Sequence, residues 1–329
     1  IVVFAMVPTT ENDGPPGTTK PLEEEAEIVK SCACSGIRWC RRCLDPELRR
    51  RAGMDPPTRM PAFLDAPDTA LDGPRAPDFV HAFDVRSGLT PGCPAFSGVR
   101  VHPDFVSEAE ARSLLEEIEA TPLVRAQSGK WKQHFGPRIN FNKRKLSANR
   151  FEGLPRYAHA IESAARRVLD EGPHPSDADH RTLERALAEY TTTDTFVLRY
   201  RQAERSNLDF HVDDEHAYGE LILGLSLESD SVLTFLEGGA ETRAGRPDGD
   251  LAVERAREET PDERPPRCVR VALPARSLLA LWGPARSHWR HAILARDIRG
   301  QRTSITLRTL APALRQTEAG QRVMRLART

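Results

Sequence analysis

The distribution of apolar positions changes twice along the chain. Residues 1–30 show no apolar periodicity and are rich in Pro, Thr, Gly and Glu, and residues 52–95 contain many prolines. Between residues 107 and 189 apolar positions recur at helical spacing, and beyond residue 195 they form short, partly alternating runs. This order predicts an α+β domain in which helices pack against a later set of antiparallel strands.

Three helices are expected in the middle part. Ser107 and Glu110 have the spacing of a capping box, in which each side chain binds a free backbone N–H of the first helical turn. Apolar residues follow at helical spacing, which predicts a helix there. Further helices are expected over about 154–169 and 181–189.

The last third of the chain predicts a double-stranded β-helix, or jelly-roll, barrel buttressed by these helices. The expected strands are short and apolar: 196–200, 221–227, 232–236, 268–273, 277–281 and 303–310. The segment 238–267 is charged, rich in Gly and Pro, and poor in large apolar residues. It is therefore interpreted as a flexible insertion between two strands.

These patterns divide the chain into five parts. We expect a disordered N-terminal segment, a Cys-rich segment, a Pro-rich linker, one large folded domain and a C-terminal tail. Their bounds are 1–30, 31–45, 46–95, 96–312 and 313–329.

The composition narrows the class of protein. Of 329 residues 39% are hydrophobic and 29% charged, and the net charge is −1, so any attraction to nucleic acid must be local. No apolar run approaches the length of a membrane span, so a membrane partner is not expected. Six cysteines in a chain this long do not suggest a secreted disulfide framework. We expect a monomer of the cytoplasm and nucleus.

The motif His211-Val212-Asp213 is the first half of a candidate metal site. Side chains two apart in a strand project to the same side, so a strand end presents both to a metal, whereas Asp214 points away. Alone, the pair is better interpreted as a polar loop with a hydrogen-bonded histidine. A second histidine, His288 or His291, follows the buried strand and turn 277–283. Two histidines and one carboxylate suit iron(II) and leave positions open for a co-substrate and dioxygen.

Arg302 and Arg308 lie six positions apart in the last expected strand and therefore on one face. Ser304 and Thr306 share that face, and a polar stripe pointing into a barrel predicts a ligand. A buried guanidinium remains charged and binds a carboxylate through two hydrogen bonds. The stripe therefore suits a dicarboxylate such as 2-oxoglutarate, although two exposed strand arginines would be the simpler interpretation.

These residues resemble the AlkB family of iron(II)/2-oxoglutarate dioxygenases. Trp282-Gly283, His291-Ala292-Ile293 and the segment 302–308 are similar to its C-terminal motif. The cysteine motif 32–43, Gln127-Ser128-Gly129 and the segment 136–141 resemble most closely the AlkB homologue four subfamily. The resemblance covers residues 32–43 and about 98–312.

The resemblance implies a role for each matching residue. His211, Asp213 and His291 would bind iron, the spacing from Trp282-Gly283 favouring His291 over His288. Arg302 would bind the far carboxylate of 2-oxoglutarate. Tyr200 would aid Arg302, Arg308 would lie near the carboxylate that also touches iron, and Ser304 would be a further co-substrate residue.

Two further motifs have several interpretations. Cys32, Cys34, Cys40 and Cys43 suit a four-thiolate structural zinc site, or are unliganded thiols. The basic segment 125–150 lacks Asp and Glu and corresponds in the family to a lid that covers the substrate; a solvated basic loop is the alternative. The expected lid residues are Lys130, Trp131, Lys132, Phe135, Arg138, Asn140 and Phe141.

The resemblance implies oxidative N-demethylation that consumes dioxygen and 2-oxoglutarate and releases succinate, CO₂ and formaldehyde. The substrate would be methyl-lysine in a protein or N6-methyladenine in DNA. A scaffold protein that retains an inactive barrel, and a zinc hydrolase that needs no 2-oxoglutarate, are the competing hypotheses.

Overall fold

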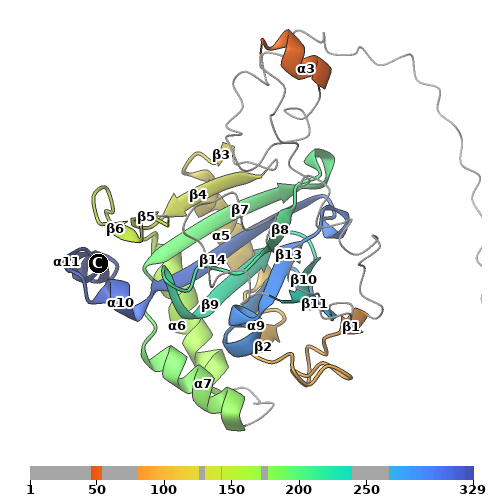
Figure 1. The fold of residues 1–329 in the computed structure, drawn as a ribbon, viewed down its shortest axis with the longest axis vertical. Coiled ribbons are helices and arrows are strands. Elements are labelled where there is room, and N and C mark those ends of the chain that lie inside the picture. The colour runs from red at the N-terminus through yellow and green to blue at the C-terminus, as the bar shows by residue number, and fades with distance from the viewer. Residues whose placement is uncertain (1–45, 54–79, 126–129, 142, 172–176, 239–266) are drawn as a thin grey trace, which may run out of the picture.

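Two facing β-sheets form the centre of the molecule (Figure 1). The computed structural model describes residues 46–53, 80–125, 130–141, 143–171, 177–238 and 267–329. In this part of the chain the larger sheet has the order β2-β12-β9-β14-β7-β4-β3, and the smaller sheet has the order β1-β11-β10-β13-β8. The expected α+β jelly-roll with helical buttresses is confirmed. The expected disordered start, the cysteine cluster and the insertion (its first and last residues apart) lie outside the described residues.

The larger sheet contains β2 (Val99–His102), β3 (Val124–Arg125), β4 (Trp131–Phe135), β7 (Asp194–Arg201), β9 (Tyr218–Leu227), β12 (Ser277–Leu281) and β14 (Gln301–Leu310). The smaller sheet contains β1 (Val80–Ala82), β8 (Leu208–His211), β10 (Ser231–Glu237), β11 (Cys268–Leu273) and β13 (Trp289–Ile293). A hairpin is formed by β5 (Arg138–Asn140) and β6 (Lys145–Ser147). The described helices are α3 (Pro46–Arg51), α5 (Glu108–Glu119), α6 (Arg156–Glu171), α7 (Asp177–Ala188), α9 (Gly283–Ser287), α10 (Pro312–Arg315) and α11 (Glu318–Leu326).

Alternation along the strands separates an outer core from an inner one. On β9 the odd-numbered Leu221, Leu223 and Leu225 pack in one cluster with residues of α5, α6 and α7, including Ile118 and Leu169. The even-numbered Ile222, Gly224 and Ser226 of the same strand line the space between the sheets, because neighbouring side chains of a strand point to opposite sides. The helices therefore cover one face of the larger sheet and leave the other face for the space between the sheets.

The segment before residue 96 differs from the expected linker. Strand β1 pairs in parallel with β11, and Phe83, Cys93 and Phe96 are buried between the sheets. The Phe96 ring lies 4.9 Å from that of Phe235 and 5.0 Å from that of Trp289. Order therefore begins by residue 80 and not near residue 96, because these isolated aromatic residues are paired by tertiary contacts that have no sequence period.

We expect Phe96→Ala to lower the free energy of unfolding by ~3–5 kcal/mol, because a buried ring is removed from a packed cluster. The matched control is Leu89→Ala in the same segment, since Leu89 is 50% exposed and such surface changes stay within about 0.5 kcal/mol. Denaturant unfolding of both variants measures the difference. Equal stability of the two would contradict the assignment of residues 80–96 to the folded core.

The C-terminal segment is also more ordered than the expected tail. Leu314, Val323 and Ala327 are buried in one cluster with Phe151 of the loop after β6, and Ile139 and Leu146 of the β5–β6 hairpin pack against it. Thr317 caps α11 by accepting a hydrogen bond from the Gly320 N–H. The last helix thus supports the hairpin from below (Figure 1).

Candidate metal centre

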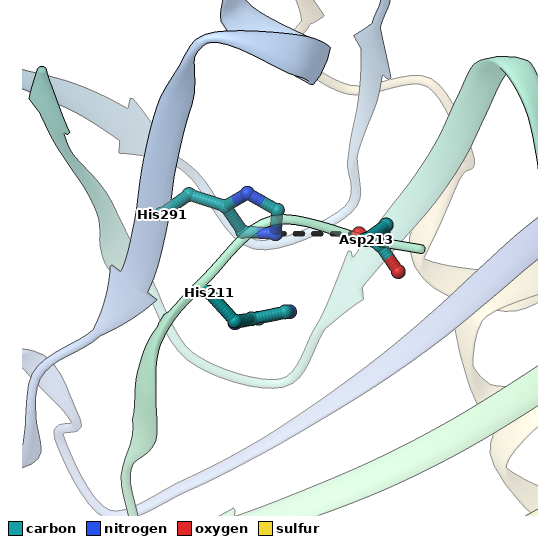
Figure 2. Close-up of side chains that lie close together, drawn as sticks. All are labelled: His211, Asp213 and His291. Atoms are coloured by element: carbon teal, nitrogen blue, oxygen red, sulfur yellow. Dashed lines mark ion pairs between the residues drawn. The ribbon is translucent and has the colours of Figure 1, made fainter. Parts of the chain in front are cut away.

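Three side chains converge where β8 and β13 meet (Figure 2). His211 ends β8 and lies opposite His291 of β13 in the register of the two strands. Asp213 follows β8 by two residues. One ligand atom from each of the three residues lies within 4.8 Å of the others. The ring centroids of His211 and His291 are 4.4 Å apart, and His291 Nε2 lies 3.5 Å from Asp213 Oδ2.

The backbone orients His211 in this cluster. Its Nδ1 lies 2.7 Å from the carbonyl oxygen of Asp209. A proton on Nδ1 donates to this carbonyl and leaves a lone pair on Nε2, which is the usual arrangement of a metal-binding histidine.

Two buried arginines hold the turn that carries Asp213. The Arg308 Nη1 donates to Asp213 Oδ1 at 2.9 Å. The Arg286 Nη1 donates to the backbone carbonyl of Asp213 at 2.7 Å, and its Nη2 reaches the carbonyls of Tyr218 and Gly219. Arg286 is 1% exposed, so this guanidinium clamps both ends of the turn between β8 and β9.

The electrostatic surroundings prepare the cluster for a cation. Burial by itself raises the pKa of the Asp213 carboxyl, but the charge of Arg308, aided by His211 and His291, holds that pKa below its usual value. Burial lowers the pKa of His291 to about 3, and the neighbouring His211 acts in the same direction. At neutral pH the cluster thus offers a carboxylate and a neutral imidazole, which are the forms that bind metals.

The polar stripe of β14 points into the space between the sheets. Arg302, Ser304, Thr306 and Arg308 line one cavity of about 1130 Å³ together with the three clustered residues. Ile305 and Leu307, which alternate with them, pack in the outer core. The stripe is therefore an internal surface and not a row of exposed strand residues.

The two arginines of the stripe have different partners. Arg302 is 4% exposed, its Nε donates to Ser226 Oγ at 3.0 Å, and its guanidinium carbon lies 5.2 Å from the centroid of the Tyr200 ring. Among the described residues no carboxylate pairs with Arg302. Arg308, in contrast, binds the carboxylates of both Asp194 and Asp213. Arg302 is thus a buried cation whose anion is missing from the described chain.

The expected lid residues divide into two groups. Arg138, Asn140 and Phe141 line the cavity from the β5–β6 hairpin. The other four do not line it: Lys130, Trp131, Lys132 and Phe135. The guanidinium groups of Arg125 and Arg201 instead lie 5.9 and 5.4 Å from the centroid of the Trp131 ring. The basic segment is not a loop throughout, since β4 joins the larger sheet beside β7.

The alternative ligands, His288 and Asp214, do not belong to the three-residue cluster. His288 is exposed at the end of α9, and its Nδ1 contacts Ser287 Oγ at 2.8 Å. Asp214 Oδ1 accepts hydrogen bonds from the backbone N–H groups of His216 and Ala217, so it caps the turn. The four N-terminal cysteines lie outside the described residues.

Several site residues were missed by sequence reasoning. Asp194, Arg286, Ser226 and His134 contact or surround the predicted residues; the first three belong to no motif, and His134 lies in the basic segment 125–150 but was not an expected lid residue. Only Asp194 had a usable signal, because a carboxylate that begins an otherwise apolar strand is unusual. Strands β8 and β13 were among the strands missed, because they have only four and five residues and the polar pair Arg290-His291 breaks the alternation of β13.

The comparison with known families decides the class of enzyme. A model of the 2OG-Fe(II) oxygenase superfamily matches residues 98–308, from the start of the barrel to Arg308. The chain belongs to this superfamily. It is a dioxygenase, and the family implies iron(II) as its cofactor and 2-oxoglutarate and dioxygen as its co-substrates.

Full-length relatives place this dioxygenase in the AlkB family. The human alpha-ketoglutarate-dependent dioxygenase alkB homolog 4 is 32% identical over 92% of this chain and 95% of its own length. Its mouse counterpart is 30% identical over 92% and 96%. A DNA N6-methyl adenine demethylase of Caenorhabditis elegans is 25% identical over 86% of this chain and 87% of its own length.

None of the described helices is long and apolar enough to cross a membrane.

Proposed function

We propose that this dioxygenase removes N-methyl groups from a methylated macromolecule, with His211, Asp213 and His291 as its iron ligands. One observation carries the proposal: the histidine–carboxylate cluster lines the same cavity as Arg302, whose guanidinium pairs with no carboxylate of the described residues. The donor set fits iron(II), which accepts imidazole and carboxylate ligands on one face. The buried guanidinium fits the far carboxylate of 2-oxoglutarate.

Arg302 and its neighbours bind and orient the co-substrate. A guanidinium donates two parallel hydrogen bonds to a carboxylate, and Ser226 and Tyr200 hold it in place beforehand. Ser304 lies between the two arginines on the same face of β14 and supplies a hydroxyl to the cavity. Co-substrate bound at Arg302 would extend along this stripe toward the iron ligands.

Bound iron(II), with dioxygen and 2-oxoglutarate, would supply the oxidation of an N-methyl group. The methyl carbon would leave as formaldehyde, and the co-substrate would leave as succinate and CO₂. The chain supplies the surroundings of that reaction. Leu198, Ile222, Leu233 and Ile293 form apolar walls that exclude water from the cavity. A cavity of about 1130 Å³ exceeds the ~300–1,000 Å³ of ordinary small-molecule sites, which leaves room for a methylated group beside the co-substrate.

Two substrate classes agree with this site. The nematode relative is described as a demethylase of N6-methyladenine in DNA, and the resemblance to AlkB homologue four implies methylated lysine in proteins. The β5–β6 hairpin presents Arg138, Lys145 and the 51% exposed Phe141 at the cavity. Positive charge beside an aromatic ring supports a nucleic-acid strand, and it also suits an acidic protein surface.

The test is a turnover assay with iron(II), 2-oxoglutarate and two sets of substrates, N6-methyladenine oligonucleotides and methyl-lysine peptides. We expect succinate and formaldehyde to form in equal amounts with one set, and Asp213→Ala to abolish both products. Removing iron with a chelator should also stop turnover, and restoring iron should recover it. Absence of succinate and of 2-oxoglutarate binding would favour a scaffold, and product without 2-oxoglutarate would favour a hydrolase.

A further inference from the structure

A line of hydrogen-bonded polar side chains runs from the cavity wall to Asp213 through the larger sheet. His134 Nε2 lies 2.5 Å from Asp194 Oδ2, and Arg308 Nε donates to Asp194 Oδ1 at 2.9 Å. Arg308 Nη1 then donates to Asp213 Oδ1 at 2.9 Å. The strands β4, β7 and β14 are neighbours, and Asp194 is paired with Arg308 in their register. The backbone therefore holds these groups together without any ligand.

This arrangement gives the two oxygens of Asp213 different surroundings. Oδ1 accepts the hydrogen bond from Arg308, whereas Oδ2 faces His291 Nε2 at 3.5 Å. Because Nε and Nη2 of Arg308 are bound to Asp194, only Nη1 reaches Asp213. A guanidinium released from Asp194 could instead bind both oxygens of Asp213, as arginine–carboxylate pairs commonly do. It would then compete with a metal for Oδ2.

The charges around the cluster lead to the same conclusion. Arg286, Arg302 and Arg308 all surround a space that contains Asp213. The side chain of Asp194 is 1% exposed and adds a buried carboxylate beside Arg308, while Asp214 is a further carboxylate that lines the cavity. Removing the charge of Asp194 would shift the charge balance around Asp213 toward the positive and weaken the attraction for a divalent cation, which is strong in a buried site.

We propose that Asp194, oriented by His134, is a positioning residue of the metal centre. Asp194 binds Nε and Nη2 of Arg308, so that the guanidinium is shared by two carboxylates. This sharing keeps Oδ2 of Asp213 available to a divalent cation. The His134 side chain lines the cavity, is 37% exposed, and contacts Asp194 from that side. The inference rests on the proposed role of Asp213 as a metal ligand.

The test measures the dissociation constant of Mn²⁺ for the full chain, from the electron paramagnetic resonance signal of free Mn²⁺. Mn²⁺ suits carboxylate and imidazole ligands and not thiolates, so the cysteine motif should not interfere. We expect Asp194→Asn to raise the dissociation constant about 10- to 100-fold, as changes in the partners of metal ligands do. His134→Gln should raise it less, because the Asp194 carboxylate remains. Turnover of both variants should recover at saturating iron(II).

The matched control is Asp104→Asn, which removes an exposed carboxylate bound to Arg276 at 2.6 Å outside the cavity. Its Mn²⁺ affinity should equal that of the wild type. Unchanged affinity in folded Asp194→Asn would overturn the inference and leave the proposed function standing, whereas a wild type that binds no Mn²⁺ would contradict both. If Asp194→Asn does not fold, His134→Gln decides alone: unchanged affinity there refutes the role.

Discussion

Replacing His291 by alanine should reduce iron-dependent turnover by more than the ~100-fold reached by changes in the partners of metal ligands, because it removes a ligand itself. His291 lies in the cluster with His211 and Asp213 and is 6% exposed. The loss should appear in succinate formation and in Mn²⁺ affinity together, since both depend on the same three ligands. Thermal unfolding of the metal-free variant separates this effect from a loss of fold.

The nearby His288 provides the matched control for His291. It lies three positions earlier, is exposed, and contacts Ser287 at the end of α9. His288→Ala should retain wild-type turnover and metal affinity. The reverse result, with His288 essential and His291 dispensable, would contradict the assignment of the metal centre.

Replacing Arg302 by methionine should weaken the binding of 2-oxoglutarate without lowering the stability of the ligand-free protein. Loss of the buried guanidinium should weaken 2-oxoglutarate binding by ~2–5 kcal/mol, the effect of truncating one partner of a buried charged pair. That loss is at least about 30-fold in the concentration of 2-oxoglutarate required, since 1.4 kcal/mol is a factor of ten. The ligand-free protein should not be destabilised, because a buried cation without a carboxylate partner is itself unfavourable.

Calorimetric titration with 2-oxoglutarate and denaturant unfolding measure these two effects. Arg302→Lys serves as the comparison: it keeps the charge but loses the forked pair of donors, so its affinity should fall between wild type and Arg302→Met. An unchanged 2-oxoglutarate requirement in Arg302→Met would remove the proposed role of Arg302. A large loss of stability without ligand would show that the guanidinium is a structural residue.

The expected strands were correct wherever one side of the strand packs in a core. The bounds of 268–273 and 277–281 agree with β11 and β12, and the other four lie within observed strands. The same alternation placed Arg302, Ser304, Thr306 and Arg308 on one face. Prediction missed the short strands β8 and β13, among others, because β8 has only four residues and the polar Arg290 and His291 interrupt the apolar pattern of β13.

Local sequence was also insufficient at both ends of the domain. Phe83 and Phe96 occur in a Pro-rich stretch, and only the pairing of β1 with β11 brings them to the core. Val323 and Ala327 were interpreted as parts of a tail, because nothing in a short C-terminal helix indicates the surface on which it packs. Contacts of this kind join residues that are far apart in the chain.

By itself the sequence determined the fold class, the metal-ligating residue types, the inward-facing arginine stripe and the AlkB resemblance. These properties follow from spacing within single strands and motifs. Tertiary structure decided that His291 and not His288 meets Asp213, that Asp194 and His134 lie beside the site, and that Arg308 has two carboxylate partners while Arg302 has none among the described residues. The physical reason is that register between strands determines which charges become neighbours, and burial determines how strongly they interact.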